Sequence, residues 1–262
     1  MDPALRTAAT GMMAQQTRVE VISNNLANVN TTAFKRSRAH FEDLLYQTVR
    51  EAQPVGEGGA EVLPAVQVGR GTRLSQVQRI DAQGPLQPTG RALDVAIEGD
   101  GLFQVLTPAG EMAYTRDGGL TISDRGVLVT QGGYPLIPDV VIPADASEVV
   151  ISRNGVVSAV LPHAVDPVEL GRMELARFTN PAGLRALGEN LFAETGASGH
   201  PLTGYPQEEG FGRLLQGALE GSNVEVVQEM VEMITALRAY EINSKAIKTA
   251  EQMGEMANNL IR

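Results

Sequence analysis

Residues 224–261 read VEVVQEMVEMITALRAYEINSKAIKTAEQMGEMANNLI. Large apolar side chains recur in this stretch at alternating three- and four-residue steps. They are Val226, Met230, Met233, Leu237, Tyr240 and Ile247. This spacing lines one side of an α-helix and is typical of helices that pack against other helices. The sequence therefore predicts a long C-terminal helix with an apolar seam. Ser222 and Glu225 have the spacing of a capping box, which predicts that the helix starts there.

The N-terminal residues 4–29 carry the same pattern. Their seam consists of Leu5, Met12, Val19, Ile22 and Leu26. Asp2 and Pro3 predict the start of this helix, and Asn28 to Asn30 predict its end. Asn24, Asn25 and Asn28 act either as capping residues or as hydrogen-bonding groups between neighbouring helices, and the sequence leaves both open. We include Asn25 and Asn28 with the apolar seam residues in a predicted subunit interface.

The middle of the chain has a different pattern. From about residue 66 to 212, short apolar or alternating runs such as 93–98 and 102–106 are separated by turn residues. Turns every eight to twelve residues favour a meandering antiparallel sheet over βαβ units. Residues 53–65, with Gly56, Gly58, Gly59 and Pro64, predict an irregular or extended connector. The expected fold class is α+β: long terminal helices forming a coiled-coil-like helical domain, with a mainly antiparallel β domain inserted between them.

Composition excludes several functional classes. The 262 residues carry a formal charge of −10 and are 43% hydrophobic, so the chain can build a core but is unsuited to binding nucleic acid. There is no cysteine, no run long enough to span a membrane and no cleavable signal-peptide pattern. We interpret the basic cluster of Lys35, Arg36 and Arg38 as a solvated or subunit-contact face. Residues 1–50 are net positive and residues 215–262 net negative, which favours association of the two ends.

Several motifs together resemble the bacterial flagellar rod and hook protein family. The N-terminal motif is SNNLANVNTTAFKR at 23–36, and the C-terminal one comprises SNVE at 222–225, EMV at 229–231 and RAYEINSK at 238–245. DVAIEGDGLF at 94–103, YTRDG at 114–118 and GENLF at 188–192 resemble the β domain of the family. Ala33 departs from the pattern, since the family usually has Gly there. If the position needs a left-handed backbone, Ala costs on the order of 1 kcal/mol.

The resemblance implies a non-enzymatic structural subunit without cofactor, metal or catalytic residues. The stretch from Phe41 to Thr72 resembles the one that distinguishes distal rod members from similarly sized proximal ones. The implied function is a rigid hollow drive shaft that transmits torque and conducts exported subunits. Implied partners are further copies of the chain, proximal rod proteins, the hook protein and the surrounding P- and L-ring proteins. The implied location is the basal body in the periplasm, reached by type III export. We expect a helical assembly domain from 1–45 and 215–262, a connector at 46–72 and an outer β domain at 73–214.

Other functions remain as alternatives at this point. A proximal rod or hook subunit of the same family is the nearest. A peptidoglycan hydrolase is a remote one, because Asp94, Glu98 and other acidic residues are candidates by type only and the chain lacks Trp. His40, His163 and His200 are scattered and do not form a short-spaced metal motif.

Overall fold

The computed structural model describes residues 3–51, 53–55, 61–63, 65–162 and 166–260. The chain forms two compact units. One contains residues 1–27, 37–79 and 225–262, and the other contains 28–36 and 80–224. We call them the helical unit and the β unit. The predictions about Asp2, His163, Gly56, Gly58, Gly59 and Pro64 lie outside the described residues.

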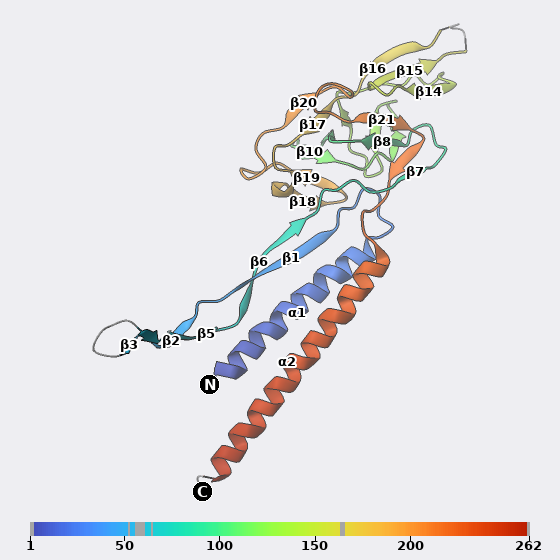
Figure 1. Ribbon diagram of the computed structural model, residues 1–262. Helices are drawn as coiled ribbons and strands as arrows, with labels where there is room; N and C mark the ends of the chain where they lie inside the picture. Colours follow the sequence, from blue (N-terminus) through green and yellow to red (C-terminus); the bar gives the residue numbers. More distant parts are fainter. Residues whose placement is uncertain (1–2, 52, 56–60, 64, 163–165, 261–262) are drawn as a thin grey trace. The chain divides into compact units, whose positions relative to one another are not determined.

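Two helices dominate the helical unit, α1 (Pro3–Ala27) and α2 (Val226–Leu260), and they lie side by side (Figure 1). After α1, Thr31 donates its amide to the carbonyl of Asn28 and its hydroxyl to the Asn28 side chain, both at 3.1 Å. This turn ends the helix where the sequence predicted. The capping-box prediction is wrong. The hydroxyl of Ser222 accepts the amide of Val224 at 3.3 Å, and α2 begins only at Val226.

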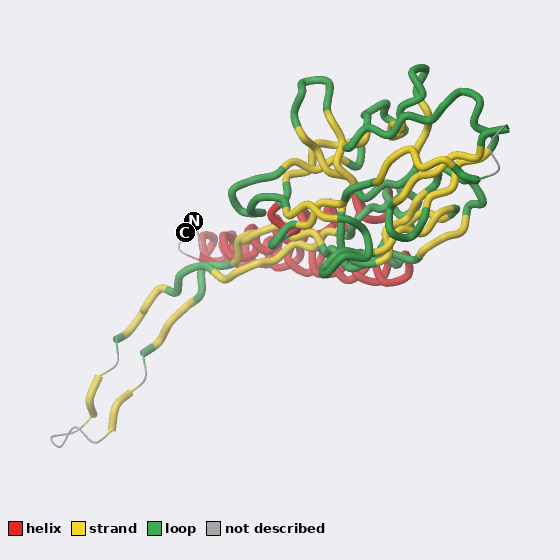
Figure 2. The backbone as a smooth tube through the Cα atoms, turned by 90° about the horizontal axis from the view of Figure 1, so that it is seen from above, coloured by secondary structure: helices red, strands yellow, loops and turns green. Residues whose placement is uncertain are grey.

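A long β-hairpin completes the helical unit. Its nested antiparallel pairs are β1 (Ser37–Asp43) with β6 (Thr72–Arg79), β2 (Gln47–Arg50) with β5 (Val66–Val68), and β3 (Gln53–Val55) with β4 (Glu61–Leu63). Figure 2 shows its two arms running side by side. The described part of the predicted connector is therefore extended, but paired rather than irregular. The division expected at residues 45, 72 and 214 stays a prediction about domains, and the compact units divide the chain elsewhere.

The β unit contains the remaining strands and the 3₁₀ helix η1 (Pro181–Gly183). Its largest sheet has the order β18 (Arg185–Gly188), β19 (Leu191–Ala193), β10 (Met112–Thr115), β9 (Leu102–Leu106), β17 (Leu175–Arg177), β20 (Leu202–Gly204), and β13 (Leu136–Ile137) also pairs with β9. A second sheet has the order β14 (Glu148–Ile151), β15 (Val156–Val160), β16 (Val168–Arg172). The two-stranded pairs are β11 (Leu120–Ile122) with β12 (Leu128–Thr130), β8 (Val95–Glu98) with β21 (Arg213–Gln216), and β7 (Leu86–Pro88) with β22 (Ala218–Glu220).

All of these pairs are antiparallel, as predicted, but the unit is not a simple meander. Strand β9 pairs with its successor β10 and also with the distant β17, while β8 and β7 pair with β21 and β22 near the end of the unit. The sides of the strands that face one another bury a core that includes Val95, Phe103, Leu120, Leu175 and Leu214. Because β21 and β22 close this core, residues 213–220 belong to the β unit.

Ala33 has a left-handed backbone, with φ of 57°. It is buried and donates its amide to the carbonyl of Glu220 at 2.8 Å. The position therefore needs the backbone geometry for which glycine is the usual choice, and this chain accommodates alanine there.

Candidate assembly interface

The two helices pack antiparallel, with small and polar residues at their contact. Arg18 of α1 and Glu232 of α2 form an ion pair at 3.5 Å, which agrees with the predicted charge attraction between the chain ends. Towards the start of α1, Gly11 approaches Asn243 so closely that a Cβ at Gly11 would lie 2.9 Å from Nδ2 of Asn243. A larger residue at position 11 would require the Asn243 side chain to move.

The inner face of α2, which is covered within the chain, differs from the predicted seam. It follows a seven-residue spacing through Glu229, Ala236, Asn243 and Ala250, of which only Asn243 is partly exposed. None of these four side chains is a large apolar group. The α1–α2 contact thus uses a stripe one residue away from the predicted one.

The large apolar residues of α2 form an exposed stripe instead. We call this stripe the outer face; it consists of Val226, Val227, Met230, Val231, Ile234, Leu237, Tyr240 and Ile242, all exposed. Four predicted interface residues, Val226, Met230, Leu237 and Tyr240, belong to it, whereas Met233 and Ile247 are half-buried. A helix that leaves this many large apolar side chains exposed is a candidate interaction site. These four predicted residues are therefore not buried against α1 in the same chain, whereas Met233 and Ile247 are partly covered.

The predicted residues of α1 are more covered. Ile22 and Asn25 are buried, and Leu5, Met12, Val19, Leu26 and Asn28 are half-buried. Asn25 donates to the carbonyl of Ser37 at 2.8 Å and to the carboxylate of Glu229 at 3.1 Å, and its Oδ1 accepts the Ser37 amide at 2.9 Å. Its side chain thus bonds inside the chain, to β1 and α2.

The β-hairpin carries a second group of exposed apolar side chains. Among the described residues of this hairpin region they are Leu45, Tyr46, Val49, Val66, Val68, Leu74 and Val77. The hairpin contacts α1 near Thr72, whose amide is 3.3 Å from the hydroxyl of Thr10. The preceding Gly71 has φ of 112°, and a Cβ there would lie 2.1 Å from that hydroxyl. Only glycine fits at this approach.

A buried ion cluster in the β unit involves one residue of the predicted basic face. Glu220 Oε1 accepts Lys35 Nζ at 2.5 Å and the Gly84 amide at 2.9 Å, while Oε2 accepts Arg116 Nε at 2.6 Å. Arg116 also donates to the carbonyls of Ile97, Gly99 and Gly101. The prediction of a solvated or subunit-contact face is therefore wrong for Lys35, which joins residues 28–36 to the rest of the β unit.

Two cations share one carboxylate in this cluster. Burial alone raises the pKa of Glu220, but Arg116 and Lys35 outweigh it, and the pKa lies below its ordinary value of 4.5. Burial lowers the pKa of Lys35 below 10.5, because the hydrogen bond to Glu220 does not fully compensate and Arg116 repels the charge. Glu220, Lys35 and Arg116 together carry a net positive charge, and the exposed Asp81 also attracts the charge of Lys35.

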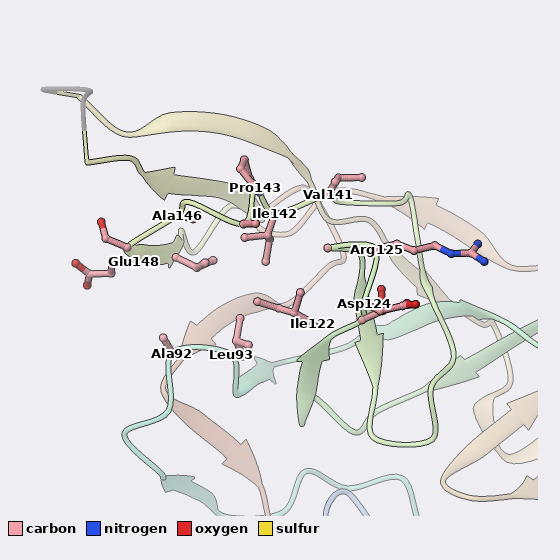
Figure 3. Close-up of a pocket in the computed structure, with 15 residues that line it drawn as sticks. Ala92, Leu93, Ile122, Asp124, Arg125, Val141, Ile142, Pro143, Ala146 and Glu148 are labelled. Atoms are coloured by element: carbon pink, nitrogen blue, oxygen red, sulfur yellow. The ribbon is translucent and has the colours of Figure 1, made fainter.

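A cavity of about 780 Å³ lies in the β unit, lined mainly by apolar side chains (Figure 3). Leu93, Ile122 and Ile142 line it, whereas the carboxylates of Asp124 and Glu148 lie towards opposite ends. Asp94 and Glu98, the acidic residues named above for a hydrolase, do not line this cavity. In the described parts of the chain, no cluster of three or more His, Cys, Asp or Glu could hold a metal, and no helix is long and apolar enough to cross a membrane.

Three family matches cover both ends and the middle of the chain. Residues 5–35 match the family described as flagella basal body rod protein, and residues 215–260 match the flagellar basal body rod FlgEFG protein C-terminal family. Residues 96–159 match the flagellar hook protein FlgE/F/G D1 domain.

Curated relatives extend this similarity to the full length. The flagellar basal-body rod protein FlgG of Borreliella burgdorferi is 52% identical over 99% of this chain and 98% of its own length. The chain belongs to the flagellar basal-body rod protein family. FlgG of Caulobacter vibrioides is 48% identical over 98% of both chains, and that of Bacillus subtilis is 37% identical over 99% of both. Membership makes the chain a non-enzymatic structural subunit of the flagellar distal rod, which confirms the prediction from the sequence motifs.

Proposed function

We propose that this rod subunit polymerises by burying the outer face of α2 against helices of neighbouring copies. The observation that carries the proposal is the exposure of its large apolar side chains in the single chain. Fully burying a Leu, Ile, Val or Met contributes about 1.5 to 3 kcal/mol, and a half-exposed side chain gains roughly half of that. Several such residues from each copy provide enough free energy for a stable polymer.

In this proposal the terminal helices of many copies form a coiled-coil-like helical domain around a central channel. The half-buried predicted interface residues of α1, including Asn28, contribute the exposed part of their side chains to the contact between copies. Asn25 and Ile22 support the interface from within each chain, because their side chains are already buried there. The β unit and the exposed β-hairpin form the outer wall. The polymer is a rigid hollow shaft that transmits torque and conducts exported subunits.

The proposed partners follow from the family. Other rod and hook proteins adjoin the shaft at its two ends, with proximal rod proteins below and the hook protein above. The P- and L-ring proteins surround it. We propose a periplasmic location, reached by type III export.

A charge placed on the outer face tests the proposal. Leu237 is 46% exposed in the single chain, so Leu237→Asp leaves the new carboxylate in water and the subunit folded. In the polymer the same carboxylate becomes buried without a partner, which opposes assembly. The control is Leu187→Asp in β18, where the leucine is 47% exposed.

Sedimentation of the wild type and both variants over a concentration series distinguishes the outcomes, with circular dichroism confirming that each subunit is folded. We expect the wild type and Leu187→Asp to form pelletable tubes and Leu237→Asp to stay in the supernatant. Tubes formed by folded Leu237→Asp at wild-type concentrations would refute the proposed interface.

A further inference from the structure

The chain passes four times between its two compact units, at 27/28, 36/37, 79/80 and 224/225. Within each unit, the segments that lead to these passages come from distant parts of the sequence. If force is to pass along these segments, interactions within each unit must keep them from shifting against one another. One asparagine side chain in each unit makes bonds suited to this task.

In the β unit this residue is Asn223, just before the last passage. Its Oδ1 accepts the amide of Arg36 at 2.7 Å, and its Nδ2 donates to the carbonyls of Ile80 and Ala82, both at 2.9 Å. Its own amide donates to the carbonyl of Phe34 at 3.3 Å. A single residue therefore joins the segments that precede the second passage, follow the third and precede the fourth.

The segments around Asn223 are also bonded to one another. The amide of Ile80 donates to the carbonyl of Arg36 at 2.8 Å. Arg36 and Ile80 are the last and the first residue of the β unit at their respective passages. The Asn223 amide group thus completes a small network built from the backbone itself.

In the helical unit the corresponding residue is Asn25, near the end of α1. It bonds both backbone groups of Ser37, the first residue of β1, and its second N–H reaches Glu229 in the first turn of α2. Asn25 and Glu229 are almost fully buried, at 1% and 0% exposed. The three elements next to the first, second and fourth passages are therefore joined by one side chain.

Asparagine suits both positions because its amide offers an acceptor and two donors in one plane. An aspartate keeps the acceptor but loses the donors, and an alanine loses both. Each bond is to the backbone or to a buried carboxylate, so the geometry of the partners is fixed by the fold.

We infer that Asn25 and Asn223 are positioning residues, two side-chain clasps that hold the passage segments in register within their own units. The clasps act through the backbone segments that they bond. Their importance for a shaft under torque rests on the proposed function, whereas the clasps themselves are a property of the single chain.

Hydrogen exchange on the full-length, dilute subunit tests the clasps directly. Asn223→Ala removes the acceptor of the Arg36 amide, and Asn25→Ala removes that of the Ser37 amide. We expect each released amide to exchange on the order of tenfold faster in its own variant, while amides of β9 and β10 keep the wild-type rates. The control is Asn180→Ala, an exposed residue of the β unit that donates to the carbonyl of Ala197.

Asn223→Asp separates the two halves of that clasp. The aspartate still accepts the Arg36 amide, so that amide should stay protected more than in Asn223→Ala. Equal acceleration of all amides in the alanine variants would overturn the inference, because it would show a general loss of stability. Unchanged exchange at Arg36 and Ser37 would also overturn it, as would failure of both Asn223 variants to fold.

Rods assembled from the variants connect the clasps to the shaft. We expect them to form at wild-type subunit concentrations but to bend more, with a persistence length reduced several-fold in electron micrographs, because local opening adds flexibility. Rods as stiff as the wild type would overturn the positioning role in the shaft. Failure of the wild-type chain to form rods would instead refute the proposed function. The exchange data on the dilute subunit would still test whether Asn25 and Asn223 hold their segments.

Discussion

Neutralising Glu220 should unfold the β unit far more readily than neutralising one of its cationic partners. In Glu220→Gln, Lys35 and Arg116 stay buried and lose the carboxylate that bonds both of them, although the exposed Asp81 still attracts the charge of Lys35. The glutamine amide group also turns a donor towards one of the three donors that the carboxylate accepted. Removing one partner of a buried ion pair costs about 3 to 5 kcal/mol, which is a large part of the roughly 5 to 15 kcal/mol that stabilises a typical domain.

Lys35→Met is the matched control for this prediction. It removes one cation and leaves Glu220 paired one-to-one with Arg116, so the net charge of the cluster becomes zero. The lost bonds of Lys35 to Glu220 and to the carbonyl of Ala82 are offset by the removal of a buried charge. We expect a cost of about 0 to 2 kcal/mol.

Urea denaturation of the dilute subunit measures both effects. Near-ultraviolet circular dichroism is a suitable signal, because Tyr114 is buried against Phe178 in the β unit with ring centroids 4.8 Å apart. A free energy of unfolding for Glu220→Gln within about 1 kcal/mol of the wild type would show that Glu220 does not compensate the two cations, since so small a loss lies well below the range expected for a broken buried pair. So would a loss in Lys35→Met as large as that in Glu220→Gln.

Three further predictions concern single positions. Because the pKa of Glu220 is lowered on folding, its contribution to stability is complete above pH 4.5 and is lost as the pH falls through the folded-state pKa. The free energies of unfolding of the wild type and Glu220→Gln, measured at a series of pH values, should therefore converge in acid. Gly71→Ala should separate the hairpin from α1, because the new Cβ meets the Thr10 hydroxyl, whereas Gly90→Ala, with φ of 73° and open space around it, should cost only its backbone strain; thermal unfolding of both variants compares them. Ala33→Gly should change the free energy of unfolding by less than about 1 kcal/mol, because relief of the left-handed strain is offset by a lost buried methyl group and a more flexible unfolded chain. Ala33→Val should cost at least about 2 kcal/mol, and urea titrations of both variants measure the difference.

The terminal helices illustrate how far the sequence predicts this fold. Periodicity alone places both helices within a few residues of their ends. It cannot predict which side of α2 packs against α1. Large apolar side chains are usually buried, and this rule selects the outer face, whereas the inner face is the one covered within a single chain. Leu237 lies on the exposed stripe, and Ala236 next to it contacts the interior. In an assembling subunit, the most apolar side of a helix can stay exposed in the single chain and contact neighbouring subunits.

The errors elsewhere have a common physical cause, which is long sequence separation. Lys35 lies in a basic cluster and looks solvated, because its partner Glu220 is 185 residues away. Ser222 has the local pattern of a capping box, yet the adjacent Asn223 bonds to Arg36 and Ile80, 187 and 143 residues away in the sequence, and α2 begins only at Val226. Ala33 was recognisable only because the family motif has glycine there.

Methionine oxidation, compared between the dilute subunit and the polymer, shows whether the outer face of α2 becomes buried on assembly. Met230 on that face is 51% exposed in the single chain, and Met112 in β10 is 39% exposed, so both should oxidise readily in the dilute subunit. If the outer face is buried in the polymer, assembly should strongly protect Met230, while Met112 stays reactive. Equal oxidation of Met230 in the subunit and in the polymer would contradict it.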